Sequence, residues 1–387
     1  MGRIKKIPAL VTMAIVICVA MANAQVADTI KKSSPKPLKN LQVEARWTGG
    51  FVMAHRPTVV YVQRQHIQGF EATLSKPLNG KQPWHTFYPR ATYGVTFHHS
   101  NLGYNEVLGK AYGAYAFLRF NVWGHKGARL RFSIGEGIVW ITKPFDKEQN
   151  HKNITIGSHI NALINLQLTY EQRITKNIFI NAGIGLTHYS NGAFTTPNLG
   201  LNMPSVSLGA TYKFYPEPIE KKYQRNEFTR SRRIIPSFIL NIGGKQIYPP
   251  DGKRYGVFTL MANFLYPIGI KSGLLLSIDV FNDRSQAAIL RHNNPNTQLS
   301  YFKTVRPGIA IGHDLWLGRM SFVFQAGVYP YTYYKGDGLI YSRLGLRYLF
   351  GKHLLANITL KTHFAKADNV EFGLGYSFGW PRVVRLL

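Results

Sequence analysis

Two polar residues near the middle of the chain, His188 and Ser190, are of the types that form a serine nucleophile and its general base. They lie two positions apart in the segment 178–190, where apolar and polar residues alternate as in a β-strand. Two such side chains leave the same face of a strand with Cα atoms roughly 6.5–7 Å apart, so that the imidazole could accept the hydroxyl proton. The pair therefore predicts a serine activated by a histidine.

The face of this segment that carries the pair is otherwise apolar. From Ile178 to Leu186 the apolar band spans nine residues, about what a membrane-spanning strand needs. Polar groups that face hydrocarbon are costly, so a functional role for His188 and Ser190 is the first explanation. The alternative is that both residues only mark where the strand meets water. With the N-terminus in the periplasm, this end of the strand lies at the outer face of the membrane.

The same alternation recurs along most of the chain, in runs of ten or more residues, with eight such segments between about 43 and 215 and eight more between about 234 and 379. Long alternating strands with an apolar side are typical of outer-membrane barrels. We therefore predict an all-β, antiparallel transmembrane barrel of about 16 strands built from two 8-strand halves, with two tandem 8-stranded barrels as the alternative. Both halves end in the same pattern, at Ser207–Phe214 and at Glu371–Phe378, which resembles the closing-strand signal that the barrel-assembly machinery reads.

The first 24 residues have the features of a secretory signal peptide. Basic residues at positions 3, 5 and 6 precede an apolar run that ends in Ala22-Asn23-Ala24, a small-residue cleavage site. We therefore expect cleavage of the signal and location in the cell outer membrane. The predicted organisation is a signal peptide at 1–24, a periplasmic N-terminal segment at 25–42, a first barrel half at 43–215, a charged periplasmic linker at 216–233, a second barrel half at 234–380 and a C-terminal tail at 381–387.

The chain is strongly basic, because 47 lysines and arginines outnumber 18 aspartates and glutamates, which gives a net charge of +29. Such a charge favours anionic partners. For an exported chain we expect a membrane surface with phosphorylated outer-membrane lipids, and no nucleic acid. The one cysteine, Cys18, lies in the signal peptide, which excludes disulfides and thiol chemistry from the mature chain.

The segment His188-Tyr189-Ser190-Asn191-Gly192, followed by Pro197-Asn198-Leu199-Gly200-Leu201-Asn202, resembles a known family. It resembles the lipid A 3-O-deacylases of the PagL type, eight-stranded outer-membrane barrels with a His-x-Ser-Asn signature on the penultimate strand. The resemblance covers the first half of the chain. It implies a serine esterase that removes an acyl chain from lipid A, with Ser190 as nucleophile, His188 as base and Asn198 as an oxyanion donor beside the backbone of Asn191 and Gly192.

The acid of the implied triad falls where this chain has Asn202. An asparagine can orient a histidine but cannot stabilise its positive form by charge, so lower activity than in a glutamate-bearing relative is expected. The other candidate is Glu136, which lies at one of the alternate positions that are otherwise apolar in its strand. We expect that a bulge at Gly135 or Gly137 turns Glu136 into the lumen.

The second half contains an apparent copy of the motif, Thr362-His363-Phe364-Ala365, in which the serine is replaced and His363 has lumen parity. Other charges with lumen parity form either a structural network or a polar pore: Asp279, Arg306, Asp314, Arg343, Arg347, Lys361 and Glu371. Metal-ligand spacings, phosphate loops and nucleotide fingerprints do not occur, so no cofactor or metal is expected. The alternative to the esterase is a non-enzymatic porin or structural barrel with a vestigial site.

Overall fold

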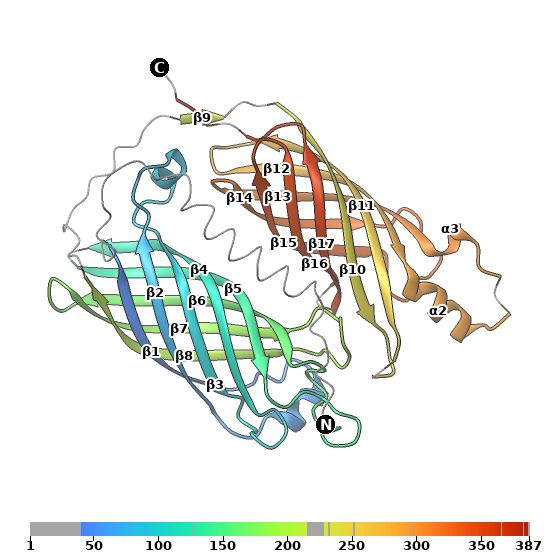
Figure 1. Cartoon of the computed structure of the whole chain (residues 1–387), viewed down its shortest axis with the longest axis horizontal. Helices are drawn as coiled ribbons and strands as arrows, with labels where there is room; N and C mark the ends of the chain where they lie inside the picture. Colours follow the sequence, from blue (N-terminus) through green and yellow to red (C-terminus); the bar gives the residue numbers. More distant parts are fainter. Residues whose placement is uncertain are drawn as a thin grey trace, which may run out of the picture. The chain divides into compact units, whose positions relative to one another are not determined.

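The computed structural model describes residues 40–214 apart from 126, and residues 228–385 apart from 231, 232, 251, 297, 365 and 382 (Figure 1). The predicted signal peptide at 1–24 lies outside the described residues, as do most of the segment 25–42 and most of the linker 216–233. Among the helices of the described part of the chain, none is both long and apolar enough to span a membrane.

The first barrel consists of eight antiparallel strands and is closed, because β1 pairs with both β2 and β8. Its last hairpin contains the predicted strand 178–190, whose bounds agree with those of β7. The strands are β1 (Gln42–Gly50), β2 (Ile67–Pro77), β3 (Thr92–Asn101), β4 (Lys110–His125), β5 (Ala128–Ile141), β6 (Ile160–Arg173), β7 (Ile178–Ser190) and β8 (Leu201–Lys213), with the 3-10 helices η1 (Pro57–Val62) and η2 (Pro83–Phe87) in the connections.

The second barrel also has eight antiparallel strands and is closed by the pairing of β10 with β17. Its strands are β10 (Ile235–Gln246), β11 (Arg254–Pro267), β12 (Ser272–Asp283), β13 (Val305–Leu317), β14 (Met320–Val328), β15 (Ile340–Phe350), β16 (Leu354–His363) and β17 (Lys366–Ser377). The helices α2 (Arg284–Asn293) and α3 (Tyr301–Thr304) connect β12 to β13, and β9 (Phe228–Arg230) pairs with β18 (Val383–Arg385) outside the barrels.

The prediction of an all-β barrel protein made of two 8-strand halves is confirmed. The arrangement is that of two separate 8-stranded barrels, so the single barrel of about 16 strands that we favoured is corrected to its alternative. The physical reason is that each half pairs its own first strand with its own last strand, which leaves neither half with a free edge to extend the other sheet. The two closing patterns, Ser207–Phe214 and Glu371–Phe378, lie at these two closures.

The inward faces of the strands carry charged side chains that pair with one another. In the first barrel, Nη1 of Arg119 lies 2.7 Å from Oε2 of Glu44. In the second barrel, Arg343 lies 3.1 Å from Asp279 through Nη1 and 2.6 Å from Glu371 through Nε. All eight residues to which we assigned lumen parity in the second half are buried, and the ion pairs among them favour a structural network over a pore: Asp279, Arg306, Asp314, Arg343, Arg347, Lys361, His363 and Glu371.

We predict that Arg343→Leu destabilises the protein by roughly 3–5 kcal/mol, because the carboxylates of Asp279 and Glu371 would remain buried without their cation. The matched control is Arg319→Leu, since Arg319 is exposed in a turn and has no ion pair among the described residues. Urea unfolding in lipid vesicles, followed by tryptophan fluorescence, measures both variants. Equal unfolding midpoints for Arg343→Leu and Arg319→Leu would contradict the structural role of the network.

Candidate active site

The hairpin from β7 to β8 brings the predicted base and the predicted orienting residue together. His188 and Asn202 are direct cross-strand partners in the register of these strands. The Nδ1 atom of His188 lies 2.6 Å from Oδ1 of Asn202. Because an amide oxygen only accepts hydrogen bonds, this contact assigns the ring proton to Nδ1 and leaves Nε2 as the basic nitrogen.

Ser190 ends β7 and shares the outward parity of His188 and Leu186. Leu186 is exposed, His188 is partly buried, and Ser190 is buried at 7% exposure where the chain turns into the loop. Between Ser190 and His188 the described side chains form no direct hydrogen bond. Such bonds in unliganded hydrolases are often long and shorten only when substrate binds.

The loop between β7 and β8 contains the candidate oxyanion donors. Oδ1 of Asn198 accepts a hydrogen bond from the backbone N–H of Asn191 at 3.0 Å, and Nδ2 of Asn191 donates to Oγ of Ser158 at 2.8 Å. The N–H of Asn191, which the resemblance placed near the oxyanion, is therefore occupied. Within the described residues, the Nδ2 group of Asn198 and the N–H of Gly192 have no partner, and they are the donors that remain.

A second loop, between β5 and β6, supports the segment that carries Asn198. Ile156 forms a β-bridge with Asn198, and the N–H of Gly200 donates to the carbonyl oxygen of Thr155 at 3.2 Å. Oδ1 of Asn153 accepts from the N–H and hydroxyl groups of Thr155, at 3.1 and 2.8 Å, and from the N–H of Ile156, at 3.2 Å. Asn153 and Thr155 have 0% exposure, so these bonds form a fixed support for the loop between β7 and β8.

The loop after β1 holds the same segment from the other side, and it contains a histidine that no sequence pattern singles out. The N–H of Met53 donates to the carbonyl oxygen of Asn202 at 2.8 Å. His55 lies 3.1 Å from the carbonyl oxygen of Leu199 through Nε2. His55 is far from the motif in sequence and its loop has no periodicity, so only the fold brings it here.

Gly200 is required by the position of the histidine ring. Its φ is +76°, in the left-handed region, and a Cβ atom there would lie 2.9 Å from Cε1 of His188. Any other residue at this position would push the imidazole away from its place between Asn202 and the loop.

The expectation that Glu136 turns into the lumen is wrong. The pairing of β5 with both neighbours is continuous through Glu136, and its side chain is exposed on the outward face. The glycines beside it serve packing rather than a bulge, because a Cβ atom at Gly135 would lie 2.5 Å from Cδ2 of Tyr115, which is buried in the lumen. Asn202, not Glu136, therefore contacts His188.

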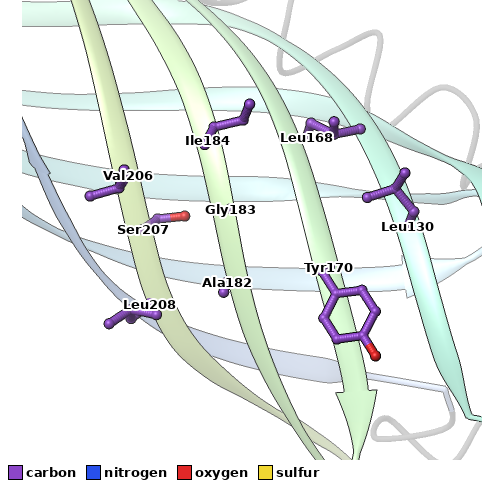
Figure 2. Close-up of a pocket in the computed structure, with 9 residues that line it drawn as sticks. All are labelled: Leu130, Leu168, Tyr170, Ala182, Gly183, Ile184, Val206, Ser207 and Leu208. Carbon is purple, nitrogen blue, oxygen red and sulfur yellow. The ribbon is translucent and has the colours of Figure 1, made fainter.

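An apolar groove of about 470 Å³ lies on the outer surface of the first barrel, across β5 to β8 (Figure 2). Ala182 and Ile184 have the same outward parity as His188 on β7. Ala182 precedes His188 by six residues, or roughly 20 Å along the strand. The groove is lined by Leu130, Leu168, Tyr170, Ala182, Gly183, Ile184, Val206, Ser207 and Leu208.

The second barrel has no equivalent site among its described residues. His363 points into the lumen, where its Nε2 lies 2.9 Å from the hydroxyl oxygen of Tyr329. Position 365, where a serine would be needed, lies outside the described residues and is alanine in the sequence. The described residues of both barrels contain no group of three or more His, Cys, Asp or Glu side chains that could hold a metal ion.

Single-cysteine labelling can test which of three positions face the lipid and which face the lumen, since the sequence after Cys18 contains no cysteine. Leu186→Cys and Glu136→Cys should react with a lipid-soluble maleimide, because both side chains are outward and exposed. Asn165→Cys should resist that reagent, because Asn165 is buried in the lumen at 6% exposure. Labelling of 165 in preference to 136 would reverse the assignment of the two faces.

Two family models match the chain, one on each barrel. Residues 68–211 match "Lipid A 3-O-deacylase (PagL)", and residues 236–380 match "Acyloxyacyl hydrolase, C-terminal domain" (PagL_C). No curated protein matches the chain.

Solved structures of outer-membrane barrels resemble the chain at low identity. The outer-membrane enzyme PagL is 14% identical, with 43% of this chain and 97% of that chain covered and a TM-score of 0.31. The translocator domain of the autotransporter NalP from Neisseria meningitidis is 11% identical, with coverages of 94% and 96% and a TM-score of 0.21. The β domain of the Bordetella autotransporter BrkA is 10% identical, with coverages of 88% and 100% and a TM-score of 0.23.

The two family matches agree with the motif on β7 and with the two closed barrels. The chain is therefore an outer-membrane barrel protein whose first barrel belongs to the PagL lipid A 3-O-deacylase family and whose second is a PagL-type C-terminal domain.

Proposed function

We propose that the protein is a serine esterase that removes an ester-linked acyl chain from the lipid A of lipopolysaccharide. The main support is the 2.6 Å contact between His188 and Asn202, which leaves a basic nitrogen on the same outward face as Ser190. A lipid substrate reaches this face without leaving the membrane. The family of the first barrel is named for the same substrate and bond.

The proposed reaction has two steps. Oγ of Ser190 attacks the ester carbonyl carbon while Nε2 of His188 takes the hydroxyl proton, and the tetrahedral intermediate then expels the sugar alcohol, which receives that proton from His188. Water next attacks the acyl-serine ester, with His188 again taking and returning one proton. The products are the free fatty acid and the deacylated glycolipid, and Ser190 is restored.

The negative charge that develops on the carbonyl oxygen needs hydrogen-bond donors that are already in place. The Nδ2 group of Asn198 is suited to this role, because its Oδ1 atom is fixed by the N–H of Asn191. The support from Asn153 and Thr155 means that the donor does not have to be ordered when substrate binds.

The outer groove gives the acyl chain a place to lie. On β7 the groove is lined from Ile184 to Ala182, and Ala182 lies roughly 20 Å along the strand from His188, a distance comparable to the length of a fatty acyl chain. Above the membrane, Lys147 and Lys152 in the loop between β5 and β6 are exposed and could meet the phosphates of lipid A.

The alternative of a porin has less support. Many of the lumen charges of both barrels are buried in ion pairs, such as Arg343 with Glu371 and Arg119 with Glu44. Moreover, a vestigial site would not need a loop that holds Asn198 by two direct contacts and Gly200 by a third.

We predict that Ser190→Ala and His188→Ala each lower the rate of acyl release by at least about three orders of magnitude, because the nucleophile and base act as a unit. Ser205→Ala is the matched control, since Ser205 lies on β8 with lumen parity. Mass spectrometry of lipid A from cells that carry each variant measures the loss of the acyl chain. Unchanged deacylation by correctly assembled Ser190→Ala would exclude the esterase.

We predict a smaller effect at the orienting residue. Asn202→Leu should lower kcat about tenfold, because the imidazole loses the acceptor that fixes its ring proton on Nδ1. Asn202→Asp should raise kcat several-fold, since a carboxylate oxygen in the same place would also stabilise the positive ring. Initial rates on purified lipid A with each variant test both directions. A rate for Asn202→Leu equal to that of the unchanged protein would contradict the orienting role.

A further inference from the structure

Nine carboxylates lie in the described strands of the two barrels, and one of them differs from the rest. Glu136 is exposed on the outward face of β5. The other eight are buried inside the barrels: Glu44, Glu71, Glu171, Asp279, Asp283, Asp314, Asp368 and Glu371. A carboxyl group that faces lipid is costly, and such a residue in a membrane span suggests a functional role.

Glu136 lies on the same cross-strand row as His188. The register connects Glu136 to Ile164, Ile164 to His188 and His188 to Asn202. Two strand spacings separate Glu136 from His188, which amounts to roughly 10 Å between their Cα atoms. Glu136 and His188 therefore face the same lipid molecules.

The surroundings of Glu136 supply no partner. Its neighbours on the two adjacent strands are Ala116 and Ile164, and no described side chain forms a hydrogen bond or ion pair with it. Ala116 is small and exposed as well. Among the described residues the carboxyl group is therefore free to bind a polar group of the lipid.

We propose that Glu136 binds a hydroxyl group on a second acyl chain of the same substrate molecule, one that is not cleaved. This inference rests on the proposed function of Ser190 and His188 and adds a selection for multiply acylated, hydroxylated glycolipids. A carboxyl group that carries its proton donates one hydrogen bond and accepts others, so it satisfies a hydroxyl in both directions.

The register favours a neighbouring chain over the cleaved chain as the source of the hydroxyl, because Ile164 lies between His188 and Glu136. The reacting carbonyl has to lie about 3–3.5 Å from Oγ of Ser190. A hydroxyl a few bonds along that chain would remain near His188, on the far side of Ile164 from Glu136. A neighbouring chain on the same sugar begins several ångströms to the side and can run down the surface of β5 and β6.

The test compares two synthetic acylated glucosamines that share the same ester-linked chain and differ only in a 3-hydroxyl group on the amide-linked chain. The unchanged protein should show a kcat/KM about three- to tenfold higher for the hydroxylated lipid, the effect of one hydrogen bond. Glu136→Leu should reduce this ratio to about one, and Glu136→Gln, whose amide also donates and accepts, should keep part of it. Phe132→Leu, on the same face of the same strand, is the matched control and should keep the full ratio.

Binding of both lipids to Ser190→Ala in detergent micelles provides a readout that does not need turnover. The affinity ratio should be three- to tenfold in that protein and about one when Glu136→Leu is added. A ratio that Glu136→Leu leaves unchanged, or a ratio of one in the unchanged protein, overturns the inference while the proposed esterase stands. If the unchanged protein releases no acyl chain but the binding ratio is intact and depends on Glu136, the esterase is overturned and the binding subsite stands.

Discussion

The structure depends on one constraint, which is that each membrane strand has two faces in opposite surroundings. Charged side chains on the inward face can pair, as Arg343 does with Asp279 and Glu371. The outward face has to be apolar unless a polar group acts on lipid. Strand β7 shows both requirements in three successive residues. Tyr189 is fully buried in the lumen with its hydroxyl 2.7 Å from Nε2 of His98, while His188 and Ser190 on either side of it point outward.

This constraint explains which parts of the fold could be predicted from the sequence. Alternation with a period of two identifies strands such as β7 and their faces, because it depends only on residues close together in the chain. Barrel closure depends on the pairing of β1 with β8, which are separated by most of the first half. Local periodicity contains no information about that pairing, so it could not decide between one barrel and two. Only the repeated closing pattern at Ser207–Phe214 and Glu371–Phe378 pointed to two closures.

The residues of the site also fall into two groups, those that the local sequence reveals and those that only the fold brings to the site. His188 and Ser190 followed from parity along one strand, and Asn202 followed from the family motif; the register of a single hairpin then brings Asn202 to His188. The residues that support the hairpin, such as Asn153 and His55, lie in loops. Loops have no periodic pattern from which these residues could be identified. Glu136 was misplaced for a related reason. Whether Gly135 and Gly137 form a bulge or accommodate a large neighbour depends on Tyr115, which lies on another strand.

The absence of a carboxylate beside His188 is consistent with the position of the site. The outward face of β7 borders hydrocarbon, where a charged side chain has a desolvation cost that a neutral amide avoids. Asn202 keeps the directional part of the acid's role, since its oxygen still fixes the ring proton on Nδ1. It gives up the electrostatic part, which matters most in the transition state, when the imidazole is positive. In the proposed mechanism the oxyanion donors therefore have to supply more of the stabilisation, and this agrees with a loop in which Asn198 is held by Asn191, Ile156 and the buried Asn153 beneath them.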